Sequence, residues 1–413
     1  MSENTLKATA MNRTKGLIFI VIAFVFFLGV TIGINFGIHC DQQFSLLAHS
    51  FRNGHLYFLD PITNCYDMTP HNGKYYWPLG PLPAVLLMPF QFAATQAGQF
   101  FYQGYLQPFL VIALLIIIFR IARRTGYGIE DSAYLAFGFA FATAFLGVGI
   151  WSSSHYSAQV LTCVLVFAAI NEITGRNRPL LVGLFFGLIL ATRVTAALGF
   201  IWCIGESLLA NSSRQDKLRW LIKATCPCLT VLALLLIYNY VRFGNAFDQG
   251  YAEQLISTHV TIARNIGLFS LSHLPGNLYY FLLSGPSPVL LDKESLVLTF
   301  PFVVANTRGM SIFVTSPCML YMFALKYRDT SSRLLLLTSA LIALPILLYY
   351  GVGYIQFGYR YSLDFLPFLY YLLIRNYHSQ KGDLTSAFKA VILVSALCNL
   401  YLFAGCFVWQ VAK

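Results

Sequence analysis

Long apolar runs alternate with short polar segments along almost the whole chain of 413 residues. A run of about 20 apolar residues is long enough to cross a bilayer as a helix. The first such run is residues 17–38 and the last is residues 391–409. Most basic residues lie in every second polar segment between these runs. Hydropathy and run length therefore predict an all-α polytopic transmembrane helical bundle of about eleven spans.

Two apolar runs depart from the simple pattern. The run of residues 180–209 is broken at residues 192–195, so we expect two short spans that meet at the outer side. The run of residues 84–94 is too short to span a bilayer, and we expect it to lie in or dip into the outer face. Pro89 is expected to interrupt this half-helix.

Basic residues set the predicted orientation. Lys7, Arg13 and Lys15 precede the first span and place the amino terminus in the cytoplasm. The loop of residues 39–103, with its juxtamembrane helices, and the segment of residues 241–309 then lie outside. The site is therefore expected to face the periplasm or exterior of the inner (plasma) membrane.

Composition supports one membrane domain over residues 1–413. The chain is 57% hydrophobic and 10% charged, and its mean hydropathy of +0.66 is too high for a soluble domain. The net charge of +11 is scattered between apolar runs, which argues against a nucleic-acid partner. Ionisable groups nevertheless gather on the outer side, so we expect the functional site to lie there. The cations predicted there include Arg52, Lys74, Arg193, Arg242, Arg264, Lys293, Arg308 and Arg360.

Asp41 is the first candidate for chemistry. It follows the first span and precedes a predicted amphipathic helix with apolar residues at 44, 47, 48 and 51, which Gly54 ends. A carboxylate here could accept the proton of an attacking hydroxyl. The alternative is an N-cap that stabilises the helix by about 1 kcal/mol. Further along the loop, a turn at Asn72-Gly73 places Lys74 and Tyr75 at the lip of the bilayer.

Arg360, Tyr361 and Asp364 form a second group at the outer mouth of a late span. Arg360 and Asp364 stand four residues apart and could simply pair on one helical face. Alternatively, the planar fork of Arg360 could grip a phosphate.

His155 and Arg193 stand at the outer ends of the middle spans. An arginine at a break between apolar half-spans is costly unless it lines a polar cavity or pairs with an anion. Both uses stay open for Arg193. His155 is a candidate ligand or a capping, interfacial histidine. The aromatic stretch of residues 239–251 is either an interfacial belt or a wall for sugar rings.

The loop resembles the first external loop of GT-C type glycosyltransferases, because a carboxylate after the first span is followed by a turn, a basic residue and a proline-rich half-helix. The stretch Tyr-Arg-Tyr-Ser-Leu-Asp of residues 359–364 resembles a late-span motif of bacterial GT-C-like proteins. His155 and Arg193 stand where similar proteins carry a histidine and an arginine. In the family many members have a second acidic residue after the first, whereas this chain has Gln42 and Gln43.

The resemblance implies a membrane glycosyltransferase that moves a hexose or pentose from a polyprenyl-phosphate donor to an envelope glycan, lipid or protein acceptor. Asp41 would accept the acceptor proton, and Arg360 would hold the donor phosphate with Arg193 or Lys74. Asp67 could supply the missing second carboxylate. The alternatives are a transporter or flippase for a lipid-linked or anionic solute, and a catalytically idle scaffold.

Cofactors and cross-links are the last sequence-level question. No spacing of ligands argues for a metal, although Asp41, Asp60 and Asp67 share a loop with several histidines, so a divalent metal stays open. No P-loop or dinucleotide motif is present, which argues against nucleotide-sugar use. Cys40 and Cys65 lie in the external loop, where we hypothesise a disulfide.

Overall fold

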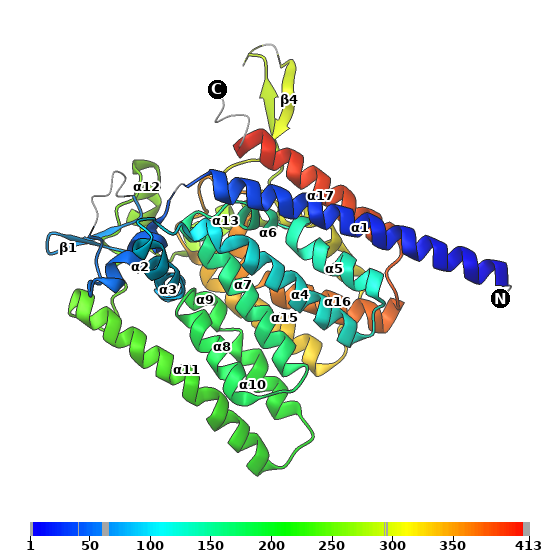
Figure 1. The fold of residues 1–413 in the computed structure, drawn as a ribbon, viewed down its shortest axis with the longest axis horizontal. Helices are drawn as coiled ribbons and strands as arrows, with labels where there is room; N and C mark the ends of the chain where they lie inside the picture. Colours follow the sequence, from blue (N-terminus) through cyan, green and yellow to red (C-terminus); the bar gives the residue numbers. More distant parts are fainter. Residues whose placement is uncertain (1–2, 40, 60–65, 293, 295, 408–413) are drawn as a thin grey trace.

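The computed structural model describes residues 3–39, 41–59, 66–292, 294 and 296–407. These residues form seventeen α-helices, four short 3-10 helices and four short strands, so the predicted all-α bundle is confirmed. Most of the helices lie side by side in one bundle (Figure 1). Cys40, Cys65 and Asp60 lie outside the described residues, and the disulfide hypothesis stays a prediction.

Six helices in the described part of the chain are long and apolar enough to cross a membrane. They lie in α1 (Glu3–Gly37), η1–α4 (Gln103–Tyr105 and Gln107–Thr125), α7 (Ser154–Ile173), α11 (Arg214–Phe243), α15 (Thr330–Leu348) and α17 (Ser386–Phe407). The run of residues 180–209 was predicted to break at residues 192–195. It breaks close to that point, because α8 (Pro179–Leu190) ends before it and α9 (Val194–Ala197) and α10 (Phe200–Leu209) follow. The total of about eleven spans is not confirmed.

The helices differ in how deeply they are buried. In α7, 78% of the apolar window is buried, and this helix packs against α4 and α8. Only 17% and 11% of the corresponding windows of α1 and α11 are buried, and both lie at the periphery (Figure 1). α8 approaches α11 closely, because a Cβ atom on Gly183 would lie 1.8 Å from the carbonyl oxygen of Ala224. Small residues permit such close helix contacts in membranes.

The total of about eleven spans counts the apolar runs of residues 133–150 and 310–325 as one span each, but each is divided in the structure. Residues 133–150 form the end of α5 (Ile129–Phe141) and α6 (Phe145–Ile150), and the Thr143 hydroxyl accepts a hydrogen bond from the backbone N–H of Phe145 between them. Residues 310–325 form α14 (Ile312–Thr315) and the 3-10 helix η3 (Pro317–Ala324). Pro317 lacks an N–H donor and begins the second piece, so one continuous α-helix is not formed.

The first external loop contains the predicted short helix. α2 (Gln43–Arg52) buries Phe44, Leu47 and Ala48 against Trp77 and Leu87. β1 (Thr69–His71) and β2 (Lys74–Tyr76) pair antiparallel, and the predicted turn has φ of 49° at Asn72 and 71° at Gly73. These positive values suit a tight hairpin.

The half-helix after the hairpin corrects one expectation. α3 (Leu82–Gln96) continues through Pro89, which does not interrupt it. Pro89 lacks the N–H that would bond to the carbonyl of residue 85, so it removes one hydrogen bond from the helix without ending it.

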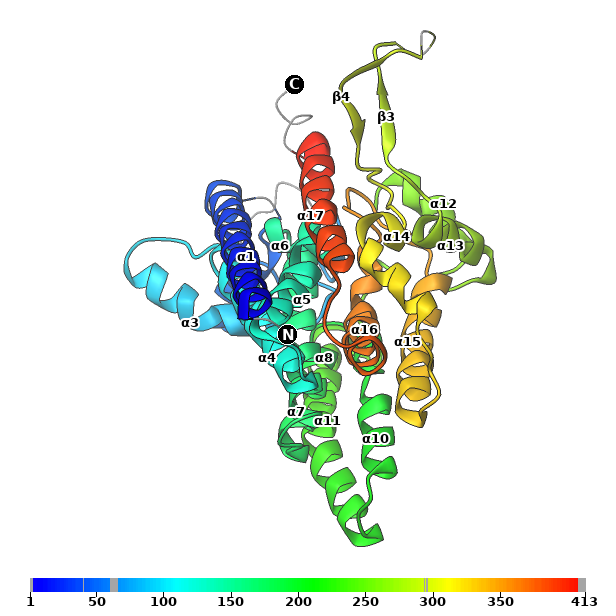
Figure 2. The same cartoon turned by 90° about the vertical axis from the view of Figure 1, so that its right-hand side faces the viewer.

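The second long external segment carries a projecting hairpin. β3 (Ser287–Leu290) and β4 (Leu298–Val304) pair antiparallel and extend beyond the end of α17 (Figure 2). The remaining elements of the described chain are α12 (Thr258–Ile266), η2 (Leu271–His273), α13 (Leu274–Leu282), η4 (Arg360–Asp364) and α16 (Leu366–Lys381).

Candidate functional site

Arg360 lies at the centre of the candidate site and is only 6% exposed. Its guanidinium carbon lies 4.5 Å from the ring centre of Tyr361 and 5.5 Å from that of Tyr156. It donates two long hydrogen bonds, of 3.3 Å to Gln159 Oε1 and 3.4 Å to the Tyr361 hydroxyl, and its Nε has no partner. Among the described residues, no carboxylate forms an ion pair with Arg360.

The possible pair between Arg360 and Asp364 is not formed. Both residues lie in the 3-10 helix η4, which has three residues per turn, so positions four apart do not share a face. Asp364 instead accepts hydrogen bonds from Arg193 Nε at 2.5 Å and Nη2 at 3.0 Å, and a further one from the Thr195 hydroxyl.

Arg193 therefore has its anionic partner within the chain. The Asp364 side chain is 1% exposed and that of Arg193 is 14% exposed, so the two charges neutralise each other away from water. The pair ties η4 to the break between α8 and α9. It also places the Arg193 guanidinium 5.8 Å from the Tyr361 ring centre, which extends the cluster around Arg360.

Asp67 and His155 form a second hydrogen-bonded pair in the site. His155 Nε2 lies 3.2 Å from Asp67 Oδ2, and Gln254 Nε2 donates to the backbone carbonyl of Asp67 at 3.0 Å. The Trp77 ring packs beside His155 at a centroid distance of 5.4 Å. Burial raises the pKa of Asp67, but the hydrogen bond and charge of His155, with the charge of Arg360, outweigh burial and hold the pKa below its usual value. Asp67 is therefore ionised at neutral pH.

Asp41 has an exposed side chain, and no described residue donates a hydrogen bond to its carboxylate. The N-cap alternative is wrong, because α2 is preceded by Gln42 and has no side-chain cap. The backbone carbonyl of Asp41 is held by Ser154, with N–H at 3.1 Å and Oγ at 2.6 Å, and by Gln103 Nε2 at 3.0 Å. The backbone of Asp41 has a φ of 51°, which few non-glycine residues adopt.

Tyr156 connects Asp41 with the centre of the site. Its hydroxyl is close enough to feel the charges of both Asp41 and Arg360. It donates a hydrogen bond to the backbone carbonyl of Ile355, just before η4. Tyr156 and Gln159, one turn further along α7, are contacts that the sequence did not single out.

Lys74 and Tyr75 lie apart from this cluster. Both are exposed on the β1–β2 hairpin, which projects from the edge of the bundle (Figure 1). The Lys74 ammonium lies 4.1 Å from the ring centre of Tyr57. No contact among the described residues links Lys74 or Tyr75 with Arg360.

Tyr251, Tyr349 and Tyr350 complete an aromatic wall that sequence reasoning did not identify residue by residue. Burial raises the pKa of Tyr251 to about 12, although the charge of nearby Arg193 acts in the opposite direction. Tyr349 packs on Tyr350 at 4.5 Å and on Tyr361 at 6.4 Å between ring centres. For Tyr251, the aromatic content of residues 239–251 was the feature of the sequence that pointed to such a wall.

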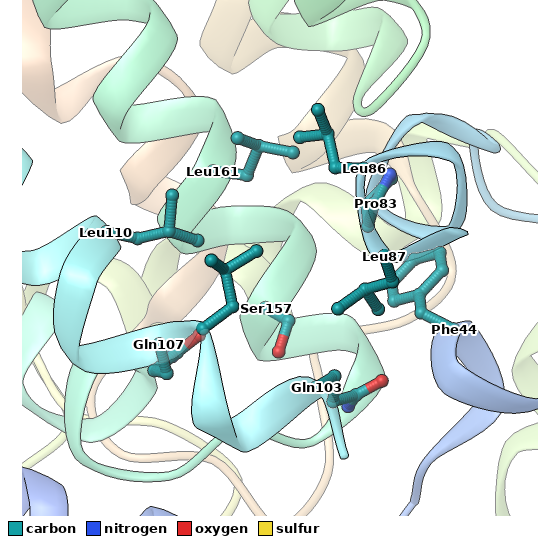
Figure 3. Close-up of a pocket in the computed structure, with 10 residues that line it drawn as sticks. Phe44, Pro83, Leu86, Leu87, Gln103, Gln107, Leu110, Ser157 and Leu161 are labelled. Carbon is teal, nitrogen blue, oxygen red and sulfur yellow. The ribbon is translucent and has the colours of Figure 1, made fainter. Parts of the chain in front are cut away.

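A narrow, mostly apolar slot lies between α2, α3, α4 and α7 (Figure 3). Its polar lining consists of Gln103, whose side chain donates a hydrogen bond to the Asp41 carbonyl, Gln107 and Ser157. The apolar lining comes from α2, α3, η1–α4 and α7, and consists of Phe44, Pro83, Leu86, Leu87, Leu106, Leu110 and Leu161.

Within the described ranges, no three or more His, Cys, Asp or Glu side chains are arranged to hold a metal ion. No protein-family model and no curated protein matches the chain.

The chain is similar to solved structures of an oligosaccharyltransferase from Archaeoglobus fulgidus. The apo structure shares 13% identity over 94% of this chain and 55% of that chain, with a TM-score of 0.48. Structures with a tethered acceptor peptide containing the NVT sequon, and with an inhibitory peptide and a dolichol-phosphate, each share 12% identity with a TM-score of 0.44. The chain therefore spans about half the length of these structures, 55% in each case.

Proposed function

We propose that the chain is a membrane glycosyltransferase that moves a sugar from a polyprenyl-phosphate donor to a glycan, lipid or protein acceptor at the outer face. The observation that carries the proposal is the state of Arg360. A buried arginine normally has an anionic partner, because removing its charge from water is costly. Arg360 has aromatic neighbours and unused N–H donors, but it forms no ion pair with a carboxylate of the described chain.

The phosphate leaving group of the proposed reaction is an acceptor suited to the unused N–H donors of Arg360. When the bond between the anomeric carbon and the phosphate oxygen breaks, the electron pair stays on the phosphate and its negative charge increases. A fixed guanidinium meets that charge with paired N–H donors. Arg193 is engaged by Asp364, so its role in the proposal is to position η4, and Lys74 is left without a role in phosphate binding.

Asp41 is the proposed base. As the acceptor oxygen bonds to the anomeric carbon, its proton passes to the Asp41 carboxylate. Asp41 is suited to this because its carboxylate is exposed and free of hydrogen bonds from described residues, whereas Asp67 is engaged by His155. The Asp67–His155 pair takes a positioning role beside Arg360.

Two apolar surfaces are suited to bind the sugar ring and the polyprenyl chain of the donor. The rings of Tyr251, Tyr349 and Tyr361 offer faces on which the apolar side of a sugar can stack, as aromatic rings do. The slot beside Gln103 offers an apolar surface for the polyprenyl chain.

The proposal is tested with purified protein in lipid, polyprenyl-phosphate sugars and an envelope acceptor fraction. Arg360→Ala should lower kcat/KM for the donor about ten- to hundredfold, because hydrogen bonds to a charged group contribute about 1.5 to 3 kcal/mol. Asp41→Asn should lower kcat by about a hundredfold or more. Two control variants, Arg308→Ala and Glu253→Gln, change exposed residues of the external segment of residues 241–309 and should leave transfer unchanged.

The same preparation separates the rival functions. Vesicle-reconstituted protein that moves a lipid-linked or anionic solute, but transfers no sugar from any donor, would identify a transporter instead. Wild-type transfer by both Arg360→Ala and Asp41→Asn would leave the proposed roles without support.

A further inference from the structure

A basic pocket lies at the opposite end of α7 from His155. Residues 155 and 172 of α7 are separated by about 26 Å along the helix axis, at 1.5 Å per residue, so this pocket is distinct from the candidate site. It is formed at the ends of α4 and α7 and the start of α8, and its lining consists of Arg120, Arg124, Asn171, Glu172, Arg176 and Arg178.

The pocket has an excess of positive charge. Four arginines and one glutamate line it, which leaves three positive charges (4 − 1 = 3). Glu172 is buried and is already engaged by Arg178, through Nε at 2.9 Å and Nη2 at 2.8 Å. Among the described residues, no carboxylate pairs with Arg120, Arg124 or Arg176.

One of these arginines is held in place by the backbone. Arg124 Nη1 donates to the Asn171 carbonyl at 2.5 Å, and its guanidinium lies against Gly175. A Cβ atom at position 175 would lie 2.4 Å from Arg124 Nη1, so glycine is what allows the guanidinium to lie there. The Asn171 Oδ1 atom beside it is buried and has no hydrogen-bond donor.

Apolar surface leads away from the pocket along the bundle. Ile116 is 47% exposed and stands one turn before Arg120 on the same face of α4. Leu180 and Leu184 on α8 are 55% and 38% exposed. A ligand that carries both a phosphate and acyl chains would contact the arginines and these side chains together.

We propose that this pocket binds the phosphodiester headgroup of an anionic phospholipid, in the leaflet that the basic pattern predicts to be cytoplasmic. Guanidinium groups bind phosphate oxygens through paired N–H donors. Basic pockets between transmembrane helices on this side are suited to anionic headgroups. The site is independent of the sugar-transfer proposal, because it lies at the other end of the bundle.

The full-length protein is placed in nanodiscs of equal parts phosphatidylglycerol and phosphatidylcholine, and lipids retained on release are counted by native mass spectrometry. The pocket variant Arg120→Gln/Arg124→Gln/Arg176→Gln should bind phosphatidylglycerol about tenfold more weakly or worse, since each tenfold is 1.4 kcal/mol. The control Arg214→Gln/Arg219→Gln/Lys223→Gln removes the same charge from α11 and should stay within about twofold of the wild type.

Thermal unfolding of both triple variants first establishes that they are folded. Equal retention of the two lipids by the wild type, or an equal loss in the pocket and control variants, would overturn the assignment. A separate titration with inorganic phosphate distinguishes the source of the phosphate. If phosphate binds the detergent-solubilised protein as tightly as the lipid does, the acyl chains contribute nothing and the lipid assignment is wrong.

Discussion

Two buried arginines of this chain show how the environment of a residue determines its use. Arg193 has a bidentate carboxylate partner in Asp364, whereas Arg360 has ring faces and two long hydrogen bonds to neutral groups. The first arrangement is electrostatically complete within the chain. The second would be completed by an external anion, which is why we propose that Arg360 binds substrate and that Arg193 positions η4.

The Arg193–Asp364 pair leads to a stability prediction. Arg193→Leu should lower the free energy of unfolding by about 3 to 5 kcal/mol, because it leaves the Asp364 carboxylate buried without a cation. The double variant Arg193→Leu/Asp364→Asn should recover much of that loss. Denaturant unfolding in detergent measures both. A single variant as stable as the wild type would show that the pair is not desolvated.

The Asp67–His155 pair leads to a pH prediction. The pKa of Asp67 in the folded chain lies below the ordinary value of 3.8. Its stabilising contribution is therefore complete above pH 3.8 and is lost as the pH falls through the lower folded value. The stability difference between wild type and Asp67→Asn should be constant down to about pH 4 and shrink below it. Thermal unfolding at a series of pH values measures this, and a difference that grows on acidification would contradict it.

At the scale of elements, the contact between α8 and α11 depends on two glycines one turn apart. A Cβ atom on Gly183 would meet the Ala224 carbonyl oxygen at 1.8 Å, and one on Gly187 would meet Val231 Cγ2 at 2.9 Å. Gly-x-x-x-Gly places both glycines on one helical face, where they let two backbones approach. The Gly-x-x-x-Gly spacing is present in the sequence, but the sequence does not indicate which helix packs against this face of α8.

Gly183→Ala should therefore separate α8 from α11 and cost about 1 to 3 kcal/mol of unfolding free energy. Gly29→Ala on α1 is the matched control, because no atom lies within 4 Å of its added Cβ. It should be neutral or stabilise by up to about 1 kcal/mol. Unfolding in mixed detergent measures both variants, and equal stability of the two would show that the close contact is absent in the membrane.

At the scale of the whole molecule, the candidate site is assembled from distant parts of the chain. Asp67 comes from the first loop, His155 from the start of α7, Arg193 from the α8–α9 break and Arg360 from η4. The basic pocket lies at the opposite end of α7. This separation predicts that the two sites face opposite sides of the membrane.

Cysteine labelling in a cysteine-free background tests that topology. Lys74→Cys, on the exposed hairpin of the first loop, should react with a membrane-impermeant maleimide in intact cells. Arg176→Cys, at the mouth of the basic pocket, should react only after permeabilisation, since positive charge is retained in the cytoplasm. The reverse pattern would invert the orientation proposed for both sites.

Local patterns predicted the local structure well. The sequence predicted the periodicity of α2, the Asn72-Gly73 turn and a break close to residues 192–195, because each depends on residues adjacent along the chain. The prediction that Pro89 interrupts the helix of residues 84–94 was wrong, because α3 continues through it. The spacing of Arg360 and Asp364 also suggested a pair that a 3-10 turn prevents, and the turn type could not be inferred from spacing alone.

The sequence by itself determined that the chain is a helical membrane bundle, because hydropathy and helical periodicity are properties of short stretches. It also marked Arg193, Arg360 and Asp364 as unusual, since charges next to apolar runs are costly. Only the tertiary structure decided that Arg193 takes Asp364 as its partner, that Asp67 contacts His155, and that Arg360 forms no ion pair with a carboxylate of the described residues. Those pairings join residues far apart along the chain, and packing of whole helices decides which charges come within hydrogen-bonding distance.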